Sequence, residues 1–160
     1  MYTFGILESG GGLSAFLAAH LPPVLLEGAD LCPAGSLAPG EILDLLVVSP
    51  DWKGEDRAAP PCRAMLVPGR LSELAGGLSA AWAVSFGISP KDSLTLSSLG
   101  EDTILLALQR EVITLTGERL DPQEFPLPRG GHTAACHVLA CAGIQLLLGV
   151  PPEELTQEPR

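Results

Sequence analysis

Three consecutive glycines, Gly10, Gly11 and Gly12, are the residues of this sequence best suited to binding an anion. They follow a short apolar run and precede a helical pattern, so N–H groups at the helix start can hold a phosphate or a carboxylate. The alternative is a tight turn in which the glycines only permit close packing. Because Glu8 is near the glycines and no lysine or arginine is, the tight turn is favoured.

Two other parts of the chain could join the glycines in a ligand site. Glu27 ends an apolar run, and His132 begins the last apolar segment. In a doubly wound sheet such positions meet at the carboxyl ends of the strands, where ligands bind. The sequence therefore offers a site for a small anionic ligand made of Gly10, Gly11, Gly12, Glu27, His132 and Thr133. Alternatively, His132 caps the helix or joins a buried hydrogen-bond network.

The charged loop at 51–57 is a weaker candidate for a site. Asp51 could bind a cation together with Glu27. A run of mixed charges is more commonly a solvated loop, and we favour that interpretation.

We do not expect the cysteines and histidines of the last third to form a metal site or a catalytic dyad. His132 and Cys136 share one helix face, and His137 and Cys141 share another, whereas zinc needs four convergent ligands. Cys136 and His137 diverge by about 100° because they are adjacent on a helix, so they cannot act as nucleophile and base. We expect buried thiols, no metal, no cofactor and no catalytic residue.

Charge and hydropathy limit the classes of partner. The 160 residues suffice for one domain over 1–160, and a net charge of −10 excludes a nucleic-acid backbone binder. Only 18% of residues are charged, so we expect a second copy of the chain or another protein to cover one face.

The uncharged run 133–150 predicts a buried helix rather than a membrane span. The four cysteines form no CxxC pair, which favours the cytoplasm.

The elements that must position these residues alternate between strand and helix. Apolar runs predict parallel strands over 2–7, 24–27, 42–49, 62–67 and 82–88. Helical spacing predicts helices over 13–21, 70–81 and 131–148, and residues 28–40 form an irregular segment. Alternating runs predict an antiparallel ribbon over 92–98, 104–108 and 112–116. The expected fold class is α/β: a three-layer, mainly parallel Rossmann-like sheet with an antiparallel ribbon at one edge.

Over residues 83–155 the chain resembles the central domain of the Mur ligase family, which includes folylpolyglutamate synthetase. The matching segments, in the family's order, are 84–87 (VSFG), 125–128 (FPLP), 130–136 (GGHTAAC) and 148–154 (LGVPPEE). The resemblance implies that residues 5–21 correspond to the family's phosphate loop and helix. It also implies that Glu27 corresponds to a strand-end glutamate near the family's metal.

The departures from this family concern the residues that handle ATP. A phosphate loop needs a lysine for the β- and γ-phosphates, and residues 8–14 (ESGGGLS) contain none. Thr133 and Cys136 replace the two asparagines that help hold the nucleotide in the family, and no Asp-His pair follows Val48. The resemblance thus implies a degenerate phosphate loop and a pseudoenzyme core.

Three functional hypotheses follow from the sequence. The first is a non-catalytic binding or assembly module that has lost ATP chemistry. The second is a small-molecule binding protein or enzyme that uses the glycines, Glu27 and His132, and it requires that Glu8, Glu27 and His132 line one open cleft. The third, a dinucleotide-binding fold unrelated to ligases, is weak because the glycines do not form G-x-G-x-x-G.

Overall fold

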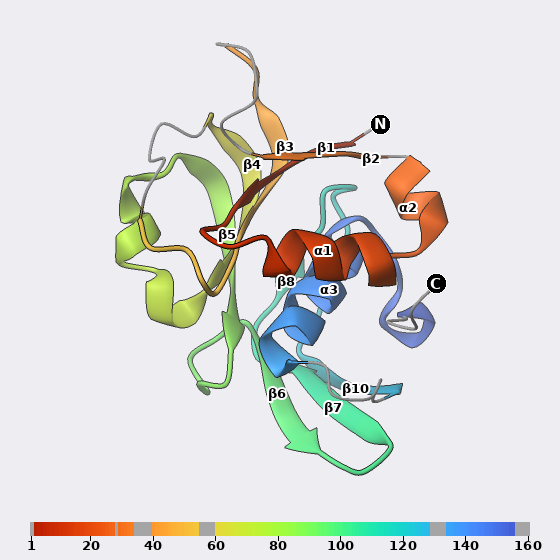
Figure 1. Ribbon diagram of the computed structural model, residues 1–160. Helices are drawn as coiled ribbons and strands as arrows, with labels where there is room; N and C mark the ends of the chain where they lie inside the picture. The colour runs from red at the N-terminus through yellow and green to blue at the C-terminus, as the bar shows by residue number, and fades with distance from the viewer. Residues whose placement is uncertain (1, 28, 34–39, 55–59, 129–133, 156–160) are drawn as a thin grey trace.

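An eight-stranded sheet runs through the protein, and helices cover one of its faces (Figure 1). The computed structural model describes residues 2–27, 29–33, 40–54, 60–128 and 134–155. In spatial order, the strands are β2 (Ala29–Pro33), β1 (Tyr2–Leu7), β3 (Leu43–Val48), β4 (Cys62–Pro68), β5 (Ala80–Gly87), β6 (Leu94–Leu99), β7 (Thr103–Leu108) and β10 (Gln123–Pro128). A separate hairpin pairs β8 (Val112–Ile113) with β9 (Arg119–Leu120).

The strand directions confirm the predicted fold class. Pairing is parallel from β2 through β1, β3, β4 and β5 to β6, and β7 runs antiparallel to both β6 and β10. The sheet is therefore mainly parallel, with an antiparallel ribbon at the edge formed by β6, β7 and β10. The order 2-1-3-4-5 of the first five strands is one of the common doubly wound orders.

Burial on both faces explains why the central strands are apolar almost throughout. Leu45 and Val47 of β3 belong to the larger core, whereas Leu46 and Val48 point to a second cluster on the opposite face. A half-buried strand would instead alternate apolar and polar residues.

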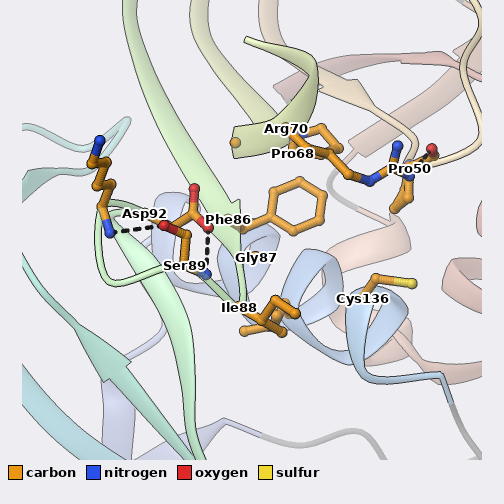
Figure 2. Close-up of a pocket in the computed structure, with 12 residues that line it drawn as sticks. Pro50, Pro68, Arg70, Phe86, Gly87, Ile88, Ser89, Asp92 and Cys136 are labelled. Atoms are coloured by element: carbon orange, nitrogen blue, oxygen red, sulfur yellow. Dashed lines mark hydrogen bonds between the residues drawn. The ribbon is translucent and has the colours of Figure 1, made fainter.

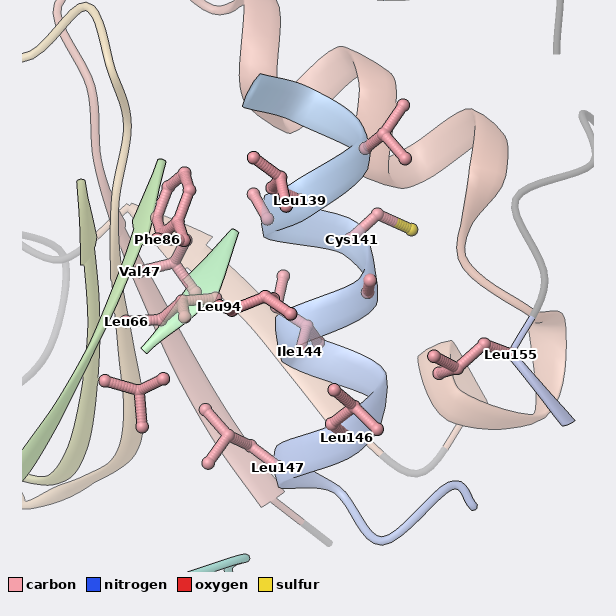
Figure 3. Packing of buried hydrophobic residues seen from close by; sticks show 14 of the residues in the cluster. Val47, Leu66, Phe86, Leu94, Leu139, Cys141, Ile144, Leu146, Leu147 and Leu155 are labelled. Carbon is pink, nitrogen blue, oxygen red and sulfur yellow. The ribbon is translucent and has the colours of Figure 1, made fainter. Parts of the chain in front are cut away.

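The larger core lies between the sheet and two helices, α1 (Gly12–His20) and α3 (Ala135–Leu147). Figure 3 shows side chains of α3, including Leu139 and Ile144, facing Phe86 and Leu66 of the sheet. A Cβ atom on Gly143 would lie 2.9 Å from Leu66 Cδ1, so glycine there lets α3 approach β4 closely. Gly149 lies just beyond the C-cap residue Leu148, and its φ of +95° is the left-handed conformation that commonly terminates a helix.

Within the described ranges, every helix falls short of the length and apolarity that a bilayer crossing requires.

The sequence predictions for the segment after the first helix are wrong. Residues 24–27 belong to a short helix, α2 (Pro23–Glu27), rather than to a strand, because Pro23 takes the first helical position and leucine and glutamate are good helix formers. The second strand is instead β2, in the segment expected to be irregular.

The predicted helix over 70–81 is also absent from the structure. Its place is taken by two 3₁₀ turns, η2 (Gly69–Leu71) and η3 (Leu74–Gly77), before β5 begins at Ala80. Gly76 and Gly77 disfavour a continued α-helix, since each lacks a side chain to restrict the unfolded backbone. With Trp52 and Ala75, these turns cover the second core cluster, which forms the third layer.

Prolines protect the outer edge of β10 from further strand pairing. Phe125 and Leu127 are buried, and Pro126 and Pro128 alternate with them. Because proline has no N–H to donate, these two residues take the positions that face away from β7. The outer edge of β10 thereby lacks backbone donors at Pro126 and Pro128, and strand pairing with a second chain through this edge is disfavoured.

Candidate functional site

The carboxyl ends of β1 and β3 lie side by side at the point where the strand order reverses. The chain leaves β1 toward β2 on one side and later returns to β3 on the other. Ligands of doubly wound sheets bind at such a switch point. Here the loop after β1 contains the three glycines and the loop after β3 contains Asp51, and Ser49 N donates to Leu7 O across the two strand ends at 2.8 Å.

The carboxylate of Asp51 accepts hydrogen bonds at the start of the turn formed by Gly10, Gly11 and Gly12, which we call the glycine turn. Gly10 N donates to Asp51 Oδ2 at 2.7 Å, and Ser9 N donates to Oδ1 at 3.4 Å. A Cβ atom on residue 10 would lie 2.7 Å from Oδ2, so only glycine permits this approach. The amides of Gly10 and Ser9 therefore bind a carboxylate of the protein itself.

The pKa of Asp51 reflects these contacts. Partial burial raises it, but hydrogen bonding to the Ser49 side chain and to the Gly10 and Ser9 amides outweighs burial and holds the pKa below its ordinary value of 3.8. Asp51 is therefore a carboxylate at neutral pH, and it places negative charge where a bound phosphate would have to lie.

A second carboxylate serves the start of α1. Glu8 Oε2 accepts a hydrogen bond from Ser14 N at 3.2 Å, in the first turn of the helix. Such a contact satisfies a helix N–H that has no partner within the helix. Together, Glu8 and Asp51 leave the glycine turn flanked by negative charge, which opposes binding of a triphosphate.

The structure does not bring the other predicted ligand residues to this turn. The register pairs Tyr2, the first residue of β1, with Ala29, so Glu27 lies near the amino end of the sheet, whereas the glycine turn follows the carboxyl end. The side chain of Glu27 lies outside the described part of the chain. His132 and Thr133 also lie outside the described residues, so their predicted role stays a prediction.

Sequence reasoning assigned Asp51 to a cation site or a solvated loop and missed its contact with the glycine turn. One signal was present in the sequence. Asp51 follows an apolar strand by three residues, as the glycines follow theirs, and parallel strands place such residues at the same edge of the sheet. The strand order needed to make these two ends neighbours was not readable from sequence.

A pocket of about 490 Å³ opens next to this turn, at the carboxyl ends of β4 and β5. Its lining is contributed by the loop after β3, by the segment from the end of β4 into η2, by the turn after β5 and by α3: Pro50, Pro68, Gly69, Arg70, Phe86, Gly87, Ile88, Ser89, Lys91, Asp92, Cys136 and Leu139. Figure 2 shows Phe86, Ile88 and Cys136 around the pocket, with Arg70 extending to Pro50. Sequence reasoning did not identify this site, because its residues come from four separate segments.

Asp92 forms one wall of the pocket and holds its turn in place. Its Oδ2 atom accepts a hydrogen bond from Ser89 N at 3.1 Å, and the residue is only 4% exposed. The carboxylate packs against the backbone of Gly69 and Gly87, where an added Cβ would overlap it. Gly69, directly after β4, and Gly87, at the end of β5, are therefore required by the close approach of Asp92 rather than by a turn conformation.

The cysteines and histidines of α3 point to different surroundings. Cys136 lines the pocket, whereas the ring of His137 lies 5.4 Å from that of Phe16 on α1. Burial raises the pKa of Cys62 to about 11 and that of Cys141 to about 12, so both remain thiols at neutral pH. Among the described residues, no three His, Cys, Asp or Glu side chains gather as metal ligands.

Comparison with known proteins adds no assignment: no protein-family model matches the chain, and no curated protein matches it either.

Proposed function

We propose that this protein is a non-catalytic binding module whose glycine turn is closed by its own Asp51 and carries no ATP chemistry. The observation that carries the proposal is the 2.7 Å hydrogen bond from Gly10 N to Asp51 Oδ2. A nucleotide phosphate would need this donor and would meet the charges of Asp51 and Glu8. The turn also has no lysine that could bind the negative charges of the phosphates.

Descent from a Mur-ligase-type central domain is part of this proposal. It accounts for the order of the four matching segments and for a glycine turn that lacks the lysine of a phosphate loop. We also propose that the protein acts in the cytoplasm and associates with a second copy of itself or with another protein. The low fraction of charged residues supports association, and the prolines of β10 favour a contact through a face rather than through that edge.

A nucleotide titration tests the proposal. At about 1 mM MgATP, a site with a dissociation constant of about 10 µM would stabilise the protein by about 2.7 kcal/mol and raise the melting temperature by several degrees. We expect no shift beyond that given by magnesium alone. Calorimetry under the same conditions should show no saturable heat, and ATP should not be hydrolysed. Saturable micromolar binding of ATP or ADP by the wild-type protein, or turnover, would contradict the proposal.

The second candidate function is small-molecule binding, which the sequence placed at the glycine turn. The pocket beside Phe86 and Cys136 supports this candidate, because it is open and lies at the carboxyl ends of parallel strands. For this second candidate function, we therefore propose the neighbouring pocket, rather than the glycine turn, as the ligand site.

A further inference from the structure

The pocket at the ends of β4 and β5 has the dimensions of a small-molecule site. Its volume of about 490 Å³ falls within the range of about 300 to 1,000 Å³ that ligand pockets span. We therefore take the second candidate function, small-molecule binding in this pocket, as the basis for assigning the chemical class of the ligand.

The walls of the pocket are mostly apolar. Phe86 and Leu139 are each 1% exposed and form its floor, so both are fixed by packing in the larger core. Ile88 is 80% exposed at the mouth. An isoleucine so exposed beside a cavity loses contact with water when an apolar ligand covers it, and this burial favours binding.

The polar groups of the pocket carry a net positive charge. Arg70 and Lys91 are cations, and Asp92 is the one carboxylate of the lining. Among described residues, neither cation has a carboxylate within ion-pair distance. Asp92 already accepts a hydrogen bond from Ser89 N and packs against two glycines, so its position is fixed without the cations. The lining therefore offers one uncompensated positive charge on a protein that is strongly acidic overall.

Arg70 is positioned to supply that charge to a ligand. Its Nη2 atom donates to the carbonyl oxygen of Pro50, which anchors the side chain at the loop after β3. A guanidinium has five N–H donors in a planar fork, so this anchor leaves donors for a carboxylate. Figure 2 shows the anchored arginine on the same side of the pocket as Cys136, with the Phe86 ring between Arg70 and Ile88.

We propose that this pocket binds a small monocarboxylate with an apolar body. The carboxylate lies at Arg70, and the apolar body packs against Phe86, Leu139 and Ile88. A single carboxylate balances the charge of the lining, and a charge-assisted hydrogen bond to the guanidinium is stronger than one between neutral groups.

Sodium octanoate and 1-octanol test the proposal, because they share the apolar chain and differ in the charged group. Binding is followed by calorimetry and by the amide resonances of Gly87, Ile88 and Ser89. We expect octanoate to bind saturably and shift these resonances, and 1-octanol to bind about tenfold more weakly. No octanoate binding, shifts confined to other residues, or equal affinity for the alcohol would overturn the proposal.

Two variants and a control locate the charge and the cavity. Arg70→Gln should weaken octanoate binding about tenfold and leave 1-octanol unaffected. Arg119→Gln makes the same change at an exposed site on β9 and should bind octanoate as the wild type does. Cys136→Trp fills the half-buried wall of the pocket and should abolish binding of both compounds. Equal losses in Arg70→Gln and Arg119→Gln, or unchanged binding in Cys136→Trp with an unchanged urea midpoint, would overturn it.

The octanoate experiment and the nucleotide titration test different sites, so failure of one proposal can be distinguished from failure of the other. Octanoate binding tests the pocket alone, whereas ATP binding tests the glycine turn. Failure of octanoate would remove this inference and leave the closed turn intact, and ATP binding at Gly10 would remove the proposed function and leave the pocket intact.

Discussion

Replacing Phe4 by alanine is expected to lower the free energy of unfolding by about 4 kcal/mol. Phe4 is 0% exposed on β1, at the centre of the core that joins the sheet to α1 and α3. The loss combines the transfer free energy of the ring with the cost of the cavity left behind, because packed neighbours relax only in part. Against a typical total stability of about 5 to 15 kcal/mol, this change removes a large share.

Urea unfolding measures the effect of Phe4→Ala, with Phe16→Ala as the matched control. Phe16 is only partly buried, on α1, where its ring stacks on His20 at 4.0 Å. We expect the Phe16 variant to lose about 1 kcal/mol, since less apolar surface returns to water. Equal midpoint shifts for the two variants would contradict the arrangement of the core described here.

Replacing Gly69 by alanine is the second change for which we expect a large effect, about 3 kcal/mol of destabilisation. The new Cβ would overlap the carboxylate of Asp92, with Asp92 Cγ 2.8 Å away. A movement of Asp92 would cost free energy, because the residue is buried and its Oδ2 atom accepts a hydrogen bond from Ser89 N. Either the carboxylate leaves its partner or the ends of β4 and β5 separate.

A double-mutant cycle isolates this contact. In an Asp92→Ala background the obstacle is gone, so Gly69→Ala should then cost less than about 1 kcal/mol. Gly76→Ala is the control, since a Cβ there meets nothing within 4 Å and the residue lies in the neighbouring 3₁₀ turn. The same cost for Gly69→Ala with and without Asp92 would show that the two residues are not in contact.

The sequence predicted the parallel strands and the ribbon because both have strong hydrophobic signatures. Residues 43–48 are apolar nearly throughout, as strands buried on both faces are, and residues 104–108 form the predicted central strand of the ribbon. The prediction of a third ribbon strand over 112–116 was wrong: Val112–Ile113 pairs with β9 in a separate hairpin, and β10 completes the ribbon. The short elements were less predictable. Residues 23–27 have an apolar run that fits either one helical turn or a strand, and only the packing of the folded chain decides between them.

The candidate site was predicted in part. The sequence offered two interpretations of the glycine turn, anion binding and a tight packing turn, and favoured the second because Glu8 is near and no base is. The occupant of the turn could not be predicted, because Asp51 is 41 residues away from Gly10 and the contact depends on which strands are neighbours. The position predicted for Glu27 was wrong because residues 24–27 were assigned to a parallel strand. Such a strand would put Glu27 at the carboxyl ends of the strands, whereas α2 precedes β2 and lies near their amino ends.

The most direct test of the closed glycine turn is the amide resonance of Gly10. A hydrogen bond to a carboxylate moves an amide proton downfield, so Asp51→Asn should move the Gly10 resonance upfield at neutral pH, whereas Asp121→Asn, at an exposed acid, should leave it unchanged. Because the pKa of Asp51 is lowered, its contribution to stability is present at neutral pH and is lost as the pH falls through a value below 3.8. The Gly10 resonance should follow that titration and should not respond to MgATP. A Gly10 resonance that ignores Asp51→Asn and shifts with MgATP would mean that the turn is an open nucleotide site.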